Sequence, residues 1–216
     1  MKTLGQLVAY LCGILRPTFW KKFESLIVIS IEAYAPGLRH QLPPILISAL
    51  VLGEDRRFYS HSGVDPIAIV SATWRLIRWG RISGASTIEQ QLVRVLTGDR
   101  RRTLGRKARE ITRACILDAL CEKSEIAGMY MAVAYFGWQM NGVEEACRRM
   151  CIDLSTMTPR QAAGLVARLK YPEPRSLSPQ REALIARRTE YLLALLSPND
   201  IAAANDASFN AALLDN

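Results

Sequence analysis

The sequence is poor in the residues that build metal centres and disulfide frameworks. It contains two histidines among 216 residues, and its five cysteines are odd in number and lie on segments with helical patterns. A disulfide framework is therefore not expected, and Cys147 and Cys151 have no partner pair at zinc-finger spacing. We predict no metal site, and we interpret the cysteines as small hydrophobic residues of the core: Cys12, Cys115, Cys121, Cys147 and Cys151.

Long apolar runs are missing as well. The stretch from Leu4 to Leu15 is apolar but too short for a helix that spans a bilayer, and it shows no small-residue cleavage site. From Thr18 to Tyr34, aromatic residues and lysines precede an aliphatic block, which suits either an interfacial helix on a membrane or an amphipathic helix docked on the core. Residues 1–41 are therefore interpreted as an N-terminal segment whose membrane association stays open.

Composition favours one globular domain with an anionic partner. Half of the residues are hydrophobic, which is enough for one sizeable core in a chain of this length. The formal net charge is +8, and the isoelectric point is near 9.5. This charge indicates a nucleic acid, an anionic membrane surface or a phosphate-bearing substrate, and it does not choose among them.

Helix signals dominate the chain, and no internal repeat or low-complexity tract is present. Pro43 and Pro44 begin a helical run, and Asp65 followed by Pro66 predicts an N-cap and a helix that continues to about Gly80. The later segments are predicted as helices over 123–137, 141–151, 158–169 and 179–196, an extended loop over Tyr171–Ser178, and a loosely ordered tail over 201–216. The predicted fold class is mainly α.

Tryptophans and arginines interleave on the helix that follows Pro66. Trp74, Arg75, Arg78 and Trp79 would suit a lipid headgroup boundary, or stacking on nucleic-acid bases. The alternative, in which both tryptophans belong to the core, has at least equal weight.

The apolar run after Pro44 ends abruptly in two carboxylates, Glu54 and Asp55. If its helix continues, one stripe holds Leu50, Glu54, Phe58 and His61. Apolar neighbours would then surround Glu54 and raise its pKa, because partial burial disfavours the charged form. A carboxylate of this kind is suited to accept a proton near neutral pH.

A second polar segment begins at Ser86. Ser86 and Glu89 form a capping-box pattern at the start of another predicted helix. One arc of that helix carries hydroxyl, amide and guanidinium groups: Thr87, Gln90, Gln91 and Arg94. A glycine-flanked helix N-terminus with such an arc suits contact with an anion or a sugar.

The segment from Arg100 to Arg113 is dense in arginine and lysine, with Thr103 as the predicted N-cap. On its helix, Arg106 and Arg113 flank Glu110 at i−4 and i+3, and nearby positive charge keeps a carboxylate ionised. A solvated basic face with i,i+4 pairs explains the same pattern, and from these residues alone it is the favoured interpretation.

Glu54 among apolar residues and Glu110 among cations form the pattern expected where environment divides acid and base roles. Three motifs contain them in order. The first, E-D-x-x-F-x-x-H-x-G-x-D, is formed by Glu54, Asp55, Phe58, His61, Gly63 and Asp65. The second, G-x-S-T-I-x-Q-Q-L, is formed by Gly84, Ser86, Thr87, Ile88, Gln90, Gln91 and Leu92. The third, R-x-x-x-R-K-x-x-E, is formed by Arg102, Arg106, Lys107 and Glu110.

Together these motifs resemble those of family 51 glycosyltransferases, the peptidoglycan transglycosylase module of monofunctional transglycosylases and bifunctional penicillin-binding proteins. Arg94 stands where that family usually has lysine, which keeps the charge but alters its geometry. The resemblance covers roughly Leu42 to Pro179. We therefore expect a glycosyltransferase domain over residues 42–200, with no transpeptidase domain.

A fourth region is divergent. Where the family usually reads K-x-x-I-L-E-x-Y-L-N-x-x-x-F-G, this chain retains Lys123, Ile126, Tyr130, Phe136 and Gly137. Gly128 and Ala132 replace the usual Glu and Asn, Gln161 replaces a usual Glu, and Asn141 replaces a usual Tyr. These departures bear on substrate preference and efficiency more than on the reaction class.

The resemblance implies polymerisation of lipid II into β-1,4-linked glycan, with inversion and release of undecaprenyl pyrophosphate. Glu54 would be the catalytic base, and Glu110 the second catalytic carboxylate, which positions the cations or the donor. The cations expected to stabilise the leaving group are Arg94, Arg102, Arg106 and Lys107. The other substrate-binding residues implied are Asp55, Ser86, Thr87, Gln90 and Gln91. His61 is expected to hold the turn after Glu54.

The resemblance further implies a lysozyme-like helical lobe with a smaller membrane-proximal jaw, at the cytoplasmic (inner) membrane with the active site on the periplasmic side. Expected partners are lipid II, the growing glycan strand, the membrane surface and other cell-wall synthesis proteins. No cofactor is expected to be obligatory, and the question whether a divalent cation such as Mg²⁺ assists stays open.

Two alternatives from other classes remain. A degenerate family member could bind lipid-linked glycan without catalysis, and Glu54 and Glu110 argue against it. A basic helical nucleic-acid-binding protein would explain the charge but leaves the ordered motifs without a purpose. No nucleic-acid partner is therefore expected.

Overall fold

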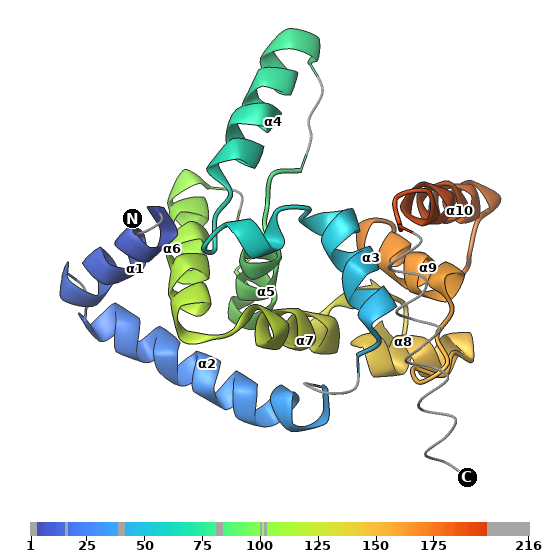
Figure 1. Cartoon of the computed structure of the whole chain (residues 1–216), viewed down its shortest axis with the longest axis horizontal. Helices are drawn as coiled ribbons and strands as arrows, with labels where there is room; N and C mark the ends of the chain where they lie inside the picture. Colours follow the sequence, from blue (N-terminus) through green and yellow to red (C-terminus); the bar gives the residue numbers. More distant parts are fainter. Residues whose placement is uncertain are drawn as a thin grey trace. The chain divides into compact units, whose positions relative to one another are not determined.

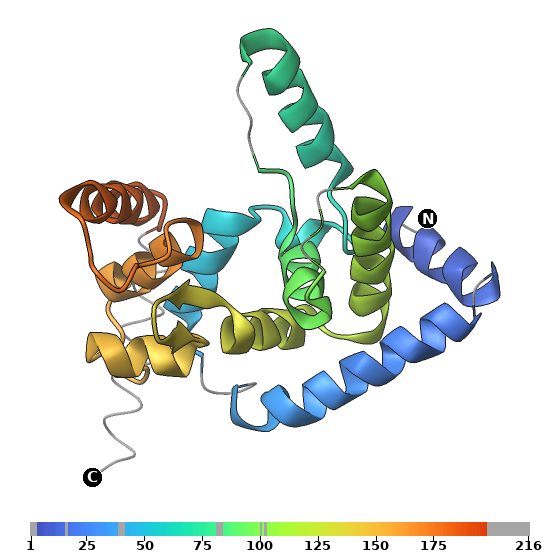
Figure 2. The same ribbon diagram turned by 180° about the vertical axis from the view of Figure 1, so that it is seen from behind.

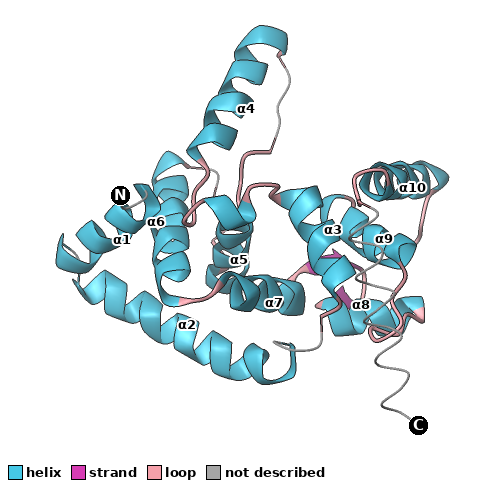
Figure 3. Cartoon of the chain, in the orientation of Figure 1, coloured by secondary structure: helices cyan, strands magenta, loops and turns pink. Residues whose placement is uncertain are grey.

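The computed structural model of the protein describes residues 4–15, 17–38, 42–80, 84–99, 101 and 103–197. Helices make up almost all the regular structure of these residues, beside one small sheet (Figures 1 and 3). The prediction of a mainly α fold is confirmed. The chain divides into two compact units, Met1–Ala33 with Arg57–Tyr130, and Tyr34–Arg56 with Met131–Asn216. The domain boundaries expected after residues 41 and 200 stay predictions.

The first unit is organised around α6 (Leu104–Leu120), because both α5 (Ile88–Thr97) and α1 (Leu4–Leu15) pack along it. The other elements of this unit are η1 (Phe58–Ser60) and α4 (Pro66–Trp79). The unit also contains α2 (Pro17–Leu38) as far as Ala33 and α7 (Lys123–Val133) as far as Tyr130. Figure 2 shows the same arrangement from behind, with α1 again beside α6.

The second unit has α9 (Pro159–Lys170) at its centre, packed against α3 (Pro44–Glu54) and α10 (Pro179–Leu193). The α9 residues Ala162–Ala167 are all buried, and four of the six are alanine or glycine, which lets the neighbouring helices approach. Its other elements are the antiparallel strands β1 (Tyr135–Gly137) and β2 (Met140–Asn141), and helix α8 (Val143–Met150).

Several helix starts agree with the sequence because their caps are local. Asp65 Oδ1 accepts hydrogen bonds from the amides of Ile67 at 3.0 Å and Ala68 at 3.2 Å, and Pro66 is the first residue of α4. Helix α4 ends before Gly80, which takes a left-handed conformation as its C-cap. Thr103 caps α6, and Pro44 begins α3, also as predicted.

Two of the predicted boundaries that are wrong show where the local pattern fails. Thr87, not Ser86, caps α5, because its hydroxyl accepts from the amide of Gln90 at 3.3 Å and donates to the carbonyl of Gly63 at 2.9 Å. The helix from Lys123 ends at Val133 instead of residue 137, since the chain then turns into β1 and pairs with β2. In the first case a contact distant in sequence overrides the local pattern, and in the second a short hairpin ends the helix.

Helix α2 docks by one face. Its Phe23 and Ile27 are buried, and the Arg113 guanidinium of α6 lies 5.2 Å from the ring centroid of Phe19 and 5.7 Å from that of Phe23. This supports the docked interpretation for that face of α2. Membrane association of residues 1–41 stays a prediction.

Helix α4 is the exception to this packing. It extends away from the other helices of its unit in both views (Figures 1 and 2), and none of its residues is buried. Trp74 and Trp79 are 61% and 58% exposed, so the interpretation of these tryptophans as core residues is wrong. Among the described residues, no helix has the length and apolar character needed to cross a membrane.

The cysteines agree in part with their predicted role in the core. Cys115, Cys121 and Cys147 are buried, whereas Cys12 is half-buried and Cys151 is exposed. Burial raises the pKa of the Cys115 thiol to about 12 and that of Cys147 to about 11, which makes both thiols poor nucleophiles.

Candidate active site

A buried carboxylate at the junction of α5 and α6 forms ion pairs with three cations. Glu110 of α6 is 3% exposed, and Arg94 of α5 donates two hydrogen bonds to it, from Nε to Oε2 at 3.0 Å and from Nη2 to Oε1 at 3.1 Å. The planar fork of the guanidinium matches the carboxylate, which makes this pair directional as well as strong. It fixes α5 against α6.

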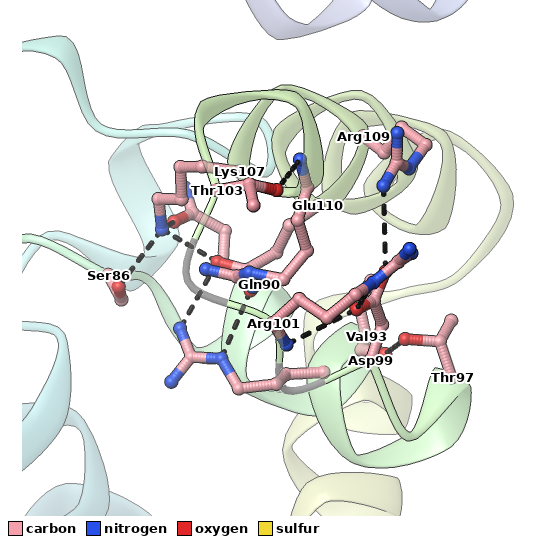
Figure 4. A network of polar contacts seen from close by, with 12 residues as sticks. Ser86, Gln90, Val93, Thr97, Asp99, Arg101, Thr103, Lys107, Arg109 and Glu110 are labelled. Atoms are coloured by element: carbon pink, nitrogen blue, oxygen red, sulfur yellow. Dashed lines mark hydrogen bonds and ion pairs between the residues drawn. The ribbon is translucent and has the colours of Figure 1, made fainter.

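Two further cations come from α6 itself. Arg106 pairs with Glu110 Oε2 one turn away, and Lys107 Nζ lies 2.6 Å from Oε1. The same ammonium donates to the side-chain oxygen of Gln90 at 2.6 Å and to Ser86 Oγ at 3.1 Å (Figure 4). Lys107 therefore uses all three of its donors within the cluster.

The cluster keeps a surplus of positive charge. Burial alone would raise the pKa of Glu110, but hydrogen bonds from Arg94 and Lys107, helped by Arg106, outweigh it and lower the pKa to about 2. The carboxylate is thus charged at neutral pH, and three cations against its one charge leave two positive charges uncompensated. Arg94 and Lys107 are 39% and 34% exposed, so an anion from solvent can reach them. The arrangement suits a ligand with two negative charges.

The polar arc predicted on α5 exists, but most of it faces inward. Gln90 is completely buried and Thr87 nearly so, while the amide oxygen of Gln91 accepts from the Tyr130 hydroxyl at 2.8 Å. The expectation of a solvent-facing polar arc is therefore wrong for Thr87 and Gln90, and their contact with a substrate stays a prediction. Their observed roles are capping and orientation of Lys107.

The interpretation of α6 as a solvated basic face is also wrong around Glu110, because this carboxylate and Arg106 are largely buried. Arg113 does not join them, since it stacks on the rings of α2, and burial lowers its pKa. Arg109 lies 3.7 Å from Asp99 instead. Of the predicted cations, Arg102 lies outside the described residues.

A second buried pair was missed by sequence reasoning. Glu89 is completely buried and forms an ion pair with Lys123 of α7, and burial raises the pKa of this carboxyl. Lys123 Nζ also lies 2.6 Å from Asp118 and 4.6 Å above the ring of Phe58. The available signal was Lys123 itself, which matches the fourth motif. This pair ties η1 to α5 and α7, in place of the capping role expected for Glu89.

The two carboxylates of the first motif belong to the second unit. Helix α3 ends at Glu54, so the stripe expected to continue through Phe58 and His61 is not formed by one helix. Glu54 is half-buried and Asp55 is buried, with its amide bonded to the carbonyl of Val51 at 3.0 Å. Glu54 is thus the last residue of α3, and the apolar surroundings expected for its side chain stay a prediction.

The end of α3 is held firmly. Arg188 of α10 donates to the carbonyl of Gly53 at 2.6 Å, and a Cβ on Gly53 would lie 2.7 Å from the Val166 side chain of α9. Arg56 donates to the Tyr191 hydroxyl of α10 at 2.6 Å. Glu54 therefore projects from a helix end fixed by two neighbouring helices, the kind of rigid support a catalytic side chain needs.

Comparison with known proteins identifies the family. The transglycosylase family model matches residues 35–196 of this chain. The chain belongs to the transglycosylase family. The match includes parts of both units and every residue described above as part of the Glu110 cluster or of the end of α3.

Curated relatives agree with this membership. The transglycosylase is 34% identical over 175 residues to a biosynthetic peptidoglycan transglycosylase of Xanthomonas campestris pv. campestris, a match that covers 75% of this chain and 70% of that protein. It is 41% identical over 109 residues to penicillin-binding protein 1B of Haemophilus influenzae and 40% identical over 114 residues to penicillin-binding protein 1A of Escherichia coli. These matches cover 48% and 52% of the chain but only 14% and 13% of the two larger proteins.

The low pKa of Glu110 makes the stability of this transglycosylase depend on pH. A carboxyl that titrates near pH 2 when folded and near its ordinary 4.5 when unfolded stabilises the fold above pH 4.5, and this contribution is lost as the pH falls towards 2. Glu110→Gln should lower the free energy of unfolding by about 3 kcal/mol at pH 7, and the deficit should shrink by about 2 kcal/mol at pH 3. Urea unfolding of the variant and of the wild-type protein at both pH values measures this difference in the free energy of unfolding.

Glu122→Gln is the matched control, because Glu122 is exposed and should leave the unfolding free energy nearly unchanged at either pH. A deficit for Glu110→Gln that is equal at pH 7 and pH 3 would contradict the assignment of a depressed pKa to this group.

Proposed function

We propose that this protein is a peptidoglycan glycosyltransferase that polymerises lipid II into β-1,4-linked glycan and releases undecaprenyl pyrophosphate. The observation that carries the proposal is the Glu110 cluster, whose two uncompensated positive charges are reachable through Arg94 and Lys107. The pyrophosphate diester of the bound donor carries two negative charges, so the cluster matches the donor in charge. The relatives whose names include peptidoglycan transglycosylase support the same reaction.

In the proposed reaction, Glu54 accepts the proton of the 4-hydroxyl on the acceptor sugar. The freed oxygen attacks the anomeric carbon of the donor, the bond from that carbon to the pyrophosphate oxygen breaks, and the configuration inverts. Support for this role comes from the half-buried position of Glu54 on a rigid helix end, where a carboxylate can be aimed. Asp55, buried beside it, supports the same end.

Negative charge grows on the leaving pyrophosphate during this step. Arg94 would contact it directly, and Lys107, whose three donors are engaged within the cluster, would act through its charge. Glu110 and Gln90 hold these two cations in fixed positions, so little reorganisation is needed at the transition state. Arg106 adds charge from behind, and Arg102 is proposed as a further contact. Ser86 and Gln91 complete the proposed substrate-binding set with Thr87, which orients α5.

The positive charge of the cluster means that no cofactor is obligatory in this proposal. A divalent cation such as Mg²⁺, if bound, would add positive charge that offsets the negative charge on the pyrophosphate oxygens. Among the residues of the cluster, the only carboxylate is Glu110, which already has three cationic partners, so these residues do not fit a metal ligand set.

The proposed substrate is anchored in lipid, so the enzyme must work at a membrane surface. Helix α4 fits this requirement, because its exposed residues include two tryptophans and several aliphatic side chains beside Arg75 and Arg78. Indole rings favour the headgroup boundary, and arginines attract anionic lipids. We place the active site at the periplasmic side of the cytoplasmic membrane, with lipid II, the glycan strand and other cell-wall synthesis proteins as partners.

Glu54→Gln should reduce glycan polymerisation from lipid II at least about 1,000-fold, since the amide cannot accept the proton. Polymer is measured by gel electrophoresis of labelled glycan in detergent. Glu144→Gln, an exposed glutamate on α8, is the matched control and should retain full activity.

Two results would change the account. Undiminished polymerisation by Glu54→Gln would reject Glu54 as the base. A wild-type protein that retains lipid II but yields no polymer would instead establish the non-catalytic binding alternative.

Replacement of both exposed tryptophans, Trp74→Ala with Trp79→Ala, should weaken binding to anionic phospholipid vesicles at least about tenfold, because each ring would otherwise bury its apolar surface in the headgroup region. Vesicle co-sedimentation measures the change. Leu177→Ala, at another exposed apolar residue, serves as the control. Equal vesicle binding by the double variant and the control would remove α4 as the membrane contact.

A further inference from the structure

Helix α1 contacts the backbone of the turn that follows η1. A Cβ atom on Gly5 would lie 1.7 Å from the carbonyl oxygen of Ser62 and 2.8 Å from its Cβ, so even alanine does not fit there without a shift. Helix α1 lies beside α6 in both views (Figures 1 and 2). The turn, residues 61–65, is therefore covered by α1 on one side.

The opposite side of the same turn rests on α6. Gly63 has a φ of +78°, and a Cβ on it would lie 2.4 Å from the carbonyl oxygen of Ala114. The Gly63 carbonyl accepts the hydroxyl of Thr87, which is the N-cap of α5. Any displacement of the turn from α6 would thus move the start of α5, the helix that holds Arg94.

A small apolar cluster closes the contact. Ala9 of α1, Val64 of the turn and Cys115 of α6 are buried together, and around them pack Val8, Trp20 and Ile111. Each side chain of the cluster contributes little to stability by itself, but together they join three segments that are distant in sequence. It has no role in the proposed chemistry, and no sequence motif includes α1.

We propose that α1 is a positioning clamp, which presses the turn 61–65 against α6 and so holds α5 and α6 in the alignment that the Arg94, Lys107 and Glu110 cluster requires. Gly5 is its key residue, because only a residue without a side chain allows this approach of the two backbones. Leu7 and Tyr10 are exposed on the outward face of α1. The effect of the clamp on the reaction rate rests on the proposed glycosyl transfer, whereas its effect on the packing of α1, the turn and α6 does not.

The test uses the full chain with Gly5→Val, whose side chain would force α1 off the turn. Leu7→Val is the matched control, because it places the same residue on the exposed face of the same helix. Gly5→Ala gives a smaller wedge, which keeps the test available if Gly5→Val does not fold. Thermal melting identifies the temperature range in which each variant is fully folded.

The structural measurement is native thiol labelling with a maleimide, mapped by peptide mass spectrometry. Cys115 is buried in the clamped cluster and should label at least about tenfold faster in Gly5→Val, because local opening exposes it. Exposed Cys151 of the second unit supplies the internal standard. Unchanged labelling of Cys115 in a folded Gly5 variant would overturn the clamp.

The kinetic measurement separates positioning from simple loss of folded protein. Misplaced cations should raise the KM for lipid II and lower kcat, each by about tenfold, since small errors in alignment cost large factors in rate. A merely structural defect would lower apparent kcat and leave KM unchanged, and that result would overturn the proposal. If the wild-type protein forms no polymer, the proposed function fails, and Cys115 labelling still decides the clamp.

Discussion

The ion pair between Arg94 and Glu110 is the constraint on which the first unit depends. A carboxylate this deeply buried would be costly if it lacked cations, and its three partners come from two helices, so the charge requirement fixes the packing of α5 on α6. The same requirement leaves positive charge in excess where Arg94 and Lys107 meet solvent. One buried negative charge thus serves both fold and site, because it gathers more cations than it neutralises.

The second unit supports its carboxylate by a different means. Glu54 is held by steric packing at the end of α3, where Gly53 lies against Val166 and its carbonyl accepts a hydrogen bond from Arg188. Glu110, by contrast, is held by ion pairs with three cations. The two glutamates therefore differ in environment, as expected when one carboxylate accepts a proton and the other stays ionised to hold cations.

Local chemistry explains which parts of the structure the sequence could predict. Asp65 with Pro66, and Thr103, cap their helices through atoms within three residues, so these starts were predicted. Thr87 was missed because its capping role depends on Gly63, a residue distant in sequence. The mainly α fold and the family follow from motif order, which a single sequence contains.

The ion-pair partners of Glu110 could not be predicted from local sequence in the same way. Helical spacing suggested Arg113 as a partner of Glu110, whereas the structure pairs Glu110 with Arg94 from another helix and stacks Arg113 on aromatic rings. Helical spacing also cannot show which face of an isolated helix is covered, so the exposure of Trp74 and the burial of Gln90 needed the tertiary structure. The sequence identified Lys123 only as a position of the fourth motif. It predicted a capping role for Glu89, the buried partner of Lys123.

The central claim is that the surplus charge of the Glu110 cluster binds the pyrophosphate of a lipid-linked donor. Its most direct test is the dissociation constant of lipid II in detergent, measured in a Glu54→Gln background that prevents turnover. The account predicts that Arg94→Gln weakens binding at least about tenfold, because a charge-assisted contact is lost, whereas Arg160→Gln on the exposed surface of the second unit does not. Equal affinity for lipid II in the Arg94 variant and its parent would contradict it.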